Sequence, residues 1–138
     1  MLRLIIFFKP YSKYLLAAWM TAVITVSSIP SLPTLKLETE GSVIRLDYLI
    51  HFMEYGIMIV LALMAFSDRL FSMQPGKLVI VTAGIVLFAI VDEFHQKLIP
   101  GRSFNVKDIL SNVTGITSGV IFYLLILKML KKRLSESE

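Results

Sequence analysis

The sequence predicts an all-α integral membrane protein, a bundle of four transmembrane helices with both termini in the cytoplasm. Three observations lead to this prediction: an apolar composition, four apolar segments and an uneven distribution of Lys and Arg. Residues of the set AVILMFWYC make up 56% of the 138 residues, and the mean hydropathy is +0.75. A soluble domain of this size has too little interior to bury so many large apolar side chains, so a bilayer is the natural second solvent.

The remaining composition narrows the class further. The chain has no cysteine, which excludes disulfides, thiolate metal sites and cysteine nucleophiles. A net charge of +4 and a pI near 9.4 raise the possibility of nucleic-acid binding, but no basic, aromatic-interleaved soluble face supports it. In a membrane protein an excess of Lys and Arg is the usual topological signal. We therefore expect the lipid bilayer, and no nucleic acid, as a partner.

We expect one domain over residues 1–138, with helices over approximately 12–30, 48–67, 78–98 and 108–130. A helix needs about 20 residues to cross a hydrocarbon core of about 30 Å. The first apolar segment has sixteen residues and ends before Pro30, and Lys13 can extend it by snorkelling to the interface. A signal peptide is the alternative for this segment, but no small-x-small cleavage site follows it.

The third apolar segment, Leu78 to Val91, has fourteen residues and would span only about 21 Å. It can cross the membrane only if the helix runs on through Asp92–Gln96, which places polar residues at membrane depth. The second and fourth segments, with nineteen residues each, are long enough as they stand. Between the helices we expect an outer loop over 31–45, an inner turn at 74–76 and an outer turn at 100–101.

Orientation follows from the Lys and Arg residues that flank the expected spans. Four spans with both termini inside place nine of these residues on the inner side and five on the outer side. The opposite orientation reverses this bias, so the positive-inside rule favours cytoplasmic termini. The expected location is a bacterial inner membrane.

On this topology nearly all polar side chains fall at the outer ends of the helices. Residues three or four apart share a helix face, which groups Asp47, His51, Glu54 and Tyr55 into one stripe. The same rule gives two further stripes, Asp92/His95/Gln96 and Asp108/Asn112/Gly115/Gly119. Ionisable side chains at membrane depth cost about 2.5–3.5 kcal/mol each, so three stripes at one level predict a shared outward-facing polar pocket. Its candidate residues are Asp47, His51, Glu54, Asp92, Glu93, His95, Gln96, Arg102, Asp108 and Asn112.

Each candidate also has a purely structural interpretation. His51 alone fits an interhelical hydrogen bond, and Glu54 fits a neutral carboxyl bonded to a carbonyl. Asp47 and Asp108 fit helix N-terminal caps, and Arg102 fits an ion pair in a loop. Packing alone, however, does not require two histidines and five carboxylates at one level.

Two kinds of chemistry remain open for the cluster. Oxygen and nitrogen donors from Asp47, His51, Glu54, Asp92, Glu93 and His95 would suit zinc, manganese or iron, although no spacing signature such as HExxH is present. Acid/base catalysis with Ser27 or Ser28 as nucleophile is the other option, again without a visible elbow or triad order. No cofactor-binding motif is apparent, and the sequence names no cofactor.

The same residues carry a family resemblance. Three groups of residues in fixed order resemble the motifs of the VanZ-like family: Ser27-Ser28-Ile29-Pro30; Asp47, His51-Phe52 and Glu54-Tyr55; and Asp92-Glu93-Phe94-His95-Gln96 with Pro100-Gly101-Arg102, Asp108, Asn112, Gly115 and Gly119. The match runs from Ser27 to Gly119, about two-thirds of the chain.

The resemblance implies a small multi-pass envelope protein. The family takes its name from a protein associated with resistance to teicoplanin, a lipoglycopeptide antibiotic. Two functional hypotheses follow. In the first, a non-enzymatic envelope factor binds a lipid headgroup, a cell-wall precursor or a glycopeptide at the outer surface. In the second, a small intramembrane hydrolase or transferase acts on a lipid-linked or cell-wall substrate. Catalysis requires groups within hydrogen-bond reach of one another, whereas binding requires only a complementary pocket.

Overall fold

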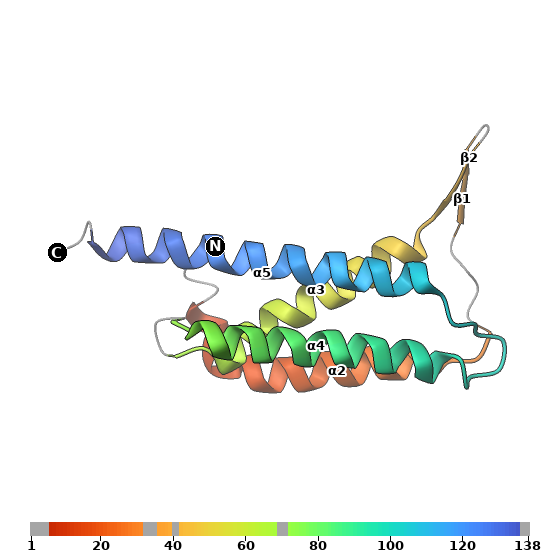
Figure 1. Ribbon diagram of the computed structural model, residues 1–138, viewed down its shortest axis with the longest axis horizontal. Coiled ribbons are helices and arrows are strands. Elements are labelled where there is room, and N and C mark those ends of the chain that lie inside the picture. Colours follow the sequence, from red (N-terminus) through yellow and green to blue (C-terminus); the bar gives the residue numbers. More distant parts are fainter. Residues whose placement is uncertain (1–5, 32–35, 40–41, 69–71, 136–138) are drawn as a thin grey trace.

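The computed structural model describes residues 6–31, 36–39, 42–68 and 72–135. Its elements, in chain order, are the 3-10 turn η1 (Lys9–Tyr11), α2 (Ser12–Ser27), β1 (Lys36–Thr39), β2 (Ser42–Arg45), α3 (Asp47–Phe66), α4 (Pro75–Gln96) and α5 (Val106–Ser135). The four α-helices run alternately in opposite directions, and the β-hairpin projects from one end of the bundle (Figure 1). The predicted four-helix architecture is therefore confirmed.

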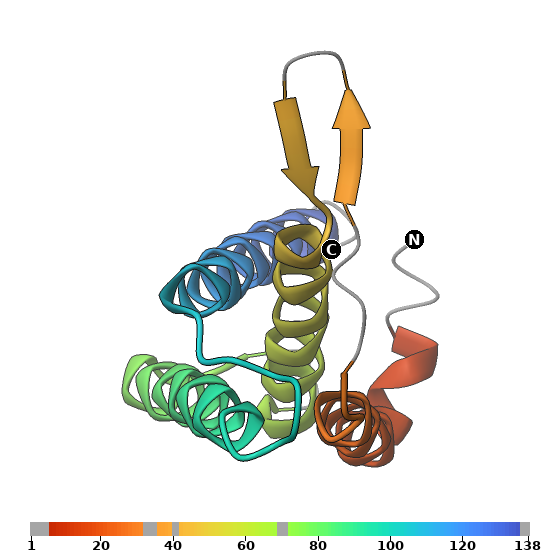
Figure 2. The ribbon, with the colours of Figure 1, turned by 90° about the vertical axis from the view of Figure 1, so that its right-hand side faces the viewer.

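Helix α3 is the centre of the bundle. Seen end-on, it lies between α5 and the pair formed by α2 and α4 (Figure 2). It supplies the largest share of the buried apolar core, to which α5 adds Ile116, Tyr123, Ile126 and Leu130, and α2 and α4 add two residues each. Because a central helix meets neighbours on several sides, its apolar surface is broader than one amphipathic stripe.

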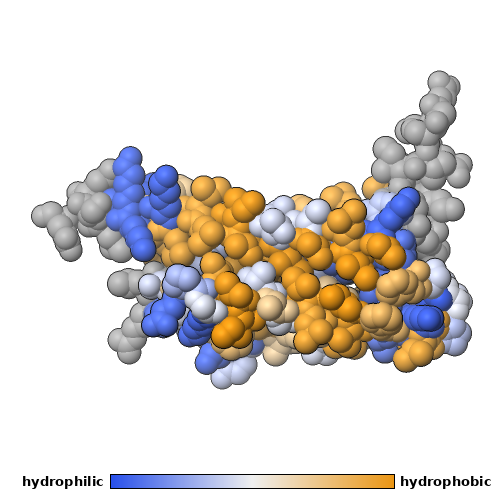
Figure 3. Space-filling view, in the orientation of Figure 1, coloured by the Kyte–Doolittle hydropathy of each residue, from blue (hydrophilic) through white to orange (hydrophobic). Residues whose placement is uncertain are grey.

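The helix lengths agree with a membrane location. Three helical segments, Asp47–Phe66, Pro75–Gln96 and Val106–Arg133, are long and apolar enough to cross a membrane. Their outer flanks expose large apolar side chains, including Val79, Ile80, Leu87, Ile121 and Leu125. These side chains form an apolar band between two hydrophilic ends (Figure 3). Hydrocarbon is the solvent that suits such a band.

Helix α2 is the short member of the bundle. Its 16 residues span about 24 Å at 1.5 Å per residue. It ends at Ser27 instead of reaching residue 30, because a turn precedes Pro30.

The segment predicted as an outer loop contains a β-hairpin. β1 and β2 pair antiparallel, with Lys36 opposite Arg45 and Thr39 opposite Ser42. The Thr and Val of these short strands suit extended structure. Residues 32–35 and 40–41 of the expected loop lie outside the described residues, as do Arg3 and Arg69 of the charge count.

Helix α4 begins earlier than expected and ends as expected. Pro75 and Gly76, predicted as a turn, form its first positions, where the missing proline N–H costs no helical hydrogen bond. The helix then runs on through Asp92–Gln96, as the fourteen-residue apolar segment required. Helix α5 extends five residues beyond the expected end at 130.

Glycines bring α3 and α5 into backbone contact. A Cβ atom at Gly115 would lie 2.2 Å from the carbonyl oxygen of Phe52, and one at Gly119 would lie 2.7 Å from that of Gly56. Both distances are too short for a real side chain, so only glycine permits this approach. Gly115 and Gly119 form a GxxxG sequence, a pattern typical of closely packed membrane helices, and it packs against the α3 backbone at Phe52 and Gly56.

Two turns meet at the end of the bundle that carries the hairpin. Ser31, which follows α2, has φ 53°, and Gly101, which follows α4, has φ 76°. The Ser31 amide donates to the Pro100 carbonyl at 3.1 Å. This hydrogen bond holds the turn after α2 against the turn after α4.

Candidate functional site

Asp92 is the centre of a hydrogen-bond network that joins three helices at the hairpin end of the bundle. One oxygen, Oδ2, accepts from Ser27 Oγ of α2 at 3.1 Å, from Tyr55 Oη of α3 at 3.1 Å and from Gln96 Nε2 at 3.2 Å. Asp92 and Gln96 lie one turn apart on α4 and are both buried. Three neutral donors therefore hold one buried carboxyl group.

Glu93 links α4 to the start of α5. Its side chain is fully buried, and Oε1 accepts from the backbone amide of Asn105 at 2.7 Å. Asn105 in turn donates from Nδ2 to Asp108 at 3.0 Å and accepts at Oδ1 from the amide of Lys107 at 3.1 Å. Asn105 therefore caps α5 and holds two carboxyl groups near that helix N-terminus, where the helix dipole favours negative charge.

His51 connects α3 to this second group of residues. Its Nε2 lies 3.9 Å from Asp108 Oδ2, and its Nδ1 lies 4.0 Å from Glu54 Oε2. Both separations exceed hydrogen-bond length. Asn112 lies one turn after Asp108 on α5 and is also buried.

Arg102 lies in the connection between α4 and α5 and remains partly exposed. Its Nη2 donates to Gln96 Oε1 at 2.6 Å, so it joins the Asp92 network through an amide and not through a carboxylate. It is also close enough to interact electrostatically with His51, Glu54 and Glu93. One cation thus lies beside both halves of the cluster.

The structure sorts the ten candidate residues into two sets. Eight of them lie in one polar cluster built from α3, α4, α5 and the connection before α5: His51, Glu54, Asp92, Glu93, Gln96, Arg102, Asp108 and Asn112. Asp47 lies in the first turn of α3 and is partly exposed. The His95 side chain makes no hydrogen bond or ion pair with any described residue.

The position of His95 differs from the predicted stripe. The buried face of α4 consists of Asp92, Glu93 and Gln96, so Glu93 takes the place that the stripe assigned to His95. His95 at i+3 and Gln96 at i+4 both satisfy the helical spacing from Asp92. The spacing alone does not tell whether the buried face of α4 extends from Asp92 toward His95 or toward Glu93.

Three residues of the network, Ser27, Tyr55 and Asn105, were not among the ten. Ser27 was considered as a nucleophile, and the structure shows it as a donor to Asp92. Tyr55 appeared in a stripe, but its hydroxyl bond to Asp92 is revealed only by the structure. Asn105 was missed because Asp108 was interpreted as the cap of the fourth helix. The signal was present: asparagine is a preferred N-cap residue, and an acidic residue follows it three positions later.

Several buried polar atoms in the cluster have no hydrogen-bond partner in the structure. They are His51 Nδ1, Asp92 Oδ1, Glu93 Oε2 and both side-chain amide atoms of Asn112. Buried polar groups are normally satisfied, because an unpaired one costs about 1–3 kcal/mol. Their concentration at one end of the bundle marks a place where a polar group from outside would be stabilised.

The contacts of Ser27 and His51 bear on the two kinds of chemistry considered for the cluster. Ser27 donates to Asp92 and not to a histidine, and His51 faces Asp108 and Glu54. No nucleophile–histidine pair is therefore formed among the described residues. Within the same residues, no three His, Asp or Glu side chains are grouped as a metal site would require.

Comparison with known proteins places the chain in one family. A family model described as VanZ/LLP1 matches residues 2–127. No curated protein and no solved structure matches the chain.

Proposed function

Because the chain belongs to the VanZ/LLP1 family, whose VanZ-like motifs supply the buried polar cluster, we propose that it is a multi-pass inner-membrane protein of the bacterial envelope that binds a polar ligand. In this proposal α2 is a fourth span and both termini are cytoplasmic. The cluster then opens toward the outer leaflet, where lipid headgroups, cell-wall precursors and glycopeptides are accessible. The biological role of the protein in this proposal is maintenance of the cell envelope, and glycopeptide resistance would be one form of that role.

The observation that carries this proposal is the set of unpartnered buried atoms on Asp92, Glu93 and Asn112. A bundle held together only by packing gains nothing from them, because each is costly at membrane depth. The orientation is supported by charge: seven of the twelve described Lys and Arg residues lie at the end opposite the cluster, among them Lys128, Lys131 and Arg133 near the end of α5.

A deletion strain complemented with variants tests the proposal. We expect the wild-type gene, but neither Glu93→Gln nor Arg102→Gln, to restore the wild-type profile of envelope lipids, cell-wall precursors and glycopeptide sensitivity. Glu93→Gln preserves the shape of the side chain and Arg102 is partly exposed, so expression and melting temperature should stay at wild-type values. Asp68→Asn, which removes a carboxylate at the opposite end, is the matched control and should complement fully. Full complementation by both cluster variants would reject the binding site.

A second candidate, an intramembrane hydrolase or transferase, is favoured by one contact, the hydrogen bond from Ser27 to Asp92. A serine-directed fluorophosphonate distinguishes the two functions. The enzyme requires covalent labelling of the purified wild-type protein that is lost in Ser27→Ala. The binding protein requires no labelling of either the wild-type protein or Ser27→Ala.

A further inference from the structure

Two buried carboxyl groups of the cluster form no ion pair. Asp92 is 4% exposed and Glu93 is fully buried, and neither is within ion-pair distance of a described Lys or Arg side chain, although Arg102 is close enough to Glu93 to interact electrostatically. The donors that reach them are two hydroxyls, a side-chain amide and a backbone amide. Buried carboxylates are normally paired with a cation, so the positive charge of a ligand would be stabilised here.

The unpartnered atoms indicate what kind of cation fits. Three of them are oxygens, Asp92 Oδ1, Glu93 Oε2 and Asn112 Oδ1, and an ionised carboxylate or an amide oxygen accepts hydrogen bonds and donates none. A primary ammonium group carries three N–H donors and no acceptor. A bare metal ion is the poorer match, because no metal-ligand group of three is present among the described residues.

Arg102 provides the opposite charge at the exposed side of the same cluster. The structure engages one of its nitrogens, through Gln96, and leaves the guanidinium partly exposed. A guanidinium has five donors in a planar fork that matches the oxygens of a phosphate. Acidic groups inside and a cation outside therefore form a dipolar site.

We propose that the site binds a phosphate ester that carries a primary amine, the chemistry of a phosphoethanolamine headgroup. The ammonium enters between Glu93 and Asn112, and the phosphate remains at Arg102. This inference rests on the proposed binding function and names the ligand class for it. The three helices contribute residues from neighbouring ends: His51 lies near the start of α3, Glu93 in the last turn of α4 and Asn112 near the start of α5.

The two charges make distinct demands on a ligand. A phosphoglycerol headgroup offers the phosphate but no ammonium, and it brings net negative charge to an acidic interior. A phosphocholine headgroup has a positive charge, but its methyl groups leave no N–H to satisfy Glu93 Oε2. A difference in affinity among the three headgroups therefore measures the contribution of the primary amine.

The experiment is calorimetric titration of the detergent-purified protein with dihexanoyl lipids that carry phosphoethanolamine, phosphocholine or phosphoglycerol headgroups. Free phosphoethanolamine is a fourth titrant and separates a lipid from a soluble source of the same chemistry. We expect the phosphoethanolamine compounds to bind about tenfold or more tightly than the other two, since a charged hydrogen bond is at stake.

Variants then assign the two halves of the ligand. Glu93→Gln should reduce the affinity for phosphoethanolamine to the level of phosphocholine, whereas Arg102→Gln should weaken all four titrants. Asp68→Asn should leave every affinity unchanged. Equal affinity for the three headgroups, or an unchanged preference in Glu93→Gln, overturns the amine site while leaving headgroup binding in place. Failure of every titrant to bind overturns the headgroup as ligand, whereas the complementation experiment decides the proposed function separately.

Discussion

At the scale of single residues, the cluster contains buried polar atoms that lower the stability of the ligand-free protein and that a bound ligand would satisfy. Asn112 is 1% exposed, and neither atom of its amide has a partner in the structure. Asp92, by contrast, satisfies one oxygen three times and leaves the other without a partner. Stability alone would favour an apolar side chain at the first position, so the amide is best explained by a ligand.

Asn112→Leu should make the ligand-free protein more stable. Leucine has a similar size and removes an unpaired buried amide, which costs about 1–3 kcal/mol. We expect a higher melting temperature in detergent together with loss of complementation in the deletion strain. A lower melting temperature would indicate that the amide is satisfied by water or by a structural contact.

Tyr55→Phe tests the Asp92 network directly. The substitution removes one donor from Asp92 Oδ2 and leaves the ring in place. We expect a loss of about 1 kcal/mol of stability, because hydrogen bonds between membrane helices are of this order or smaller. Thermal melting of the variant beside Thr25→Val, which removes an exposed hydroxyl that bonds only within α2, gives the comparison.

At the scale of secondary-structure elements, the seam between α3 and α5 determines how the cluster is assembled. Gly56, Gly115 and Gly119 let the two backbones touch. That approach brings the His51 end of α3 to within ion-pair distance of Asp108 on α5. A small separation of the helices would therefore disturb the site as well as the packing.

Gly119→Leu should destabilise the bundle. Even a Cβ atom at this position would lie 2.3 Å from Ile59 Cγ2, and overpacking of this kind costs about 1–3 kcal/mol. Gly84→Leu on α4 is the matched control, since a Cβ atom there meets nothing within 4 Å. We expect a lower folded yield and melting temperature only for Gly119→Leu. Equal behaviour of the two variants would place the Gly119 face against lipid.

The elements also show where prediction from sequence succeeds. Apolar run length identified all four helices and required α4 to continue through Asp92–Gln96, because a span must reach a minimum length. The β-hairpin escaped notice, since strands of four residues carry no periodic apolar signal. Helical spacing placed Asp92 and Gln96 on one face but chose His95 over Glu93, because the phase of that face is determined by packing against α5.

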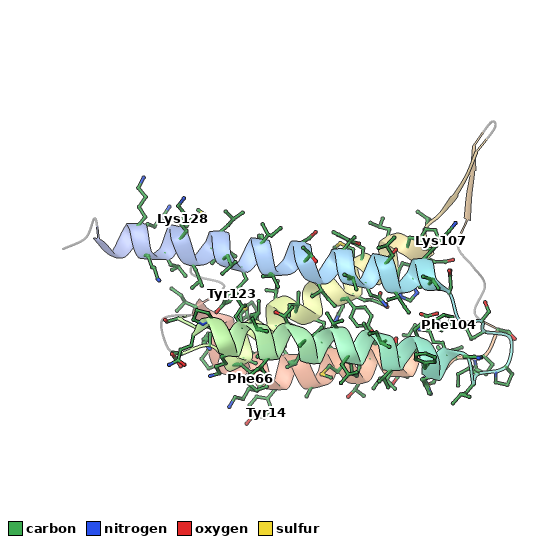
Figure 4. The ribbon with its side chains drawn as sticks, in the orientation of Figure 1. Tyr14, Phe66, Phe104, Lys107, Tyr123 and Lys128 are labelled. Atoms are coloured by element: carbon green, nitrogen blue, oxygen red, sulfur yellow. The ribbon has the colours of Figure 1, made fainter. Side chains whose placement is uncertain are left out.

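At the scale of the whole molecule, charge and hydropathy divide the structure into three zones. Figure 4 shows Lys128 and Tyr14 toward one end, and Phe104 and Lys107 at the other. The cluster belongs to the second end, where Phe94 and Phe104 stack at 5.2 Å beside it. Aromatic side chains at the level of the headgroups are typical of membrane interfaces.

Cysteine labelling tests the orientation, and the chain has no native cysteine to interfere. We expect Thr39→Cys and Ser103→Cys to react with an impermeant maleimide in intact cells, because both positions are on the outer side in the proposed topology. Gly76→Cys, at the opposite end, should react only after permeabilisation. The reverse pattern would place the cluster in the cytoplasm.

The length of α2 has a consequence for the surrounding lipid. Its 16 residues span about 24 Å, whereas the hydrocarbon core of a bilayer is about 30 Å thick. As the fourth span of the proposed topology, α2 would create hydrophobic mismatch, which the bilayer relieves by thinning locally. Since Ser27 ends α2 and bonds to Asp92, the thinned annulus would lower neighbouring headgroups toward the polar cluster. The protein should therefore function best in thin bilayers, and lengthening the acyl chains of reconstituted vesicles should reduce headgroup access.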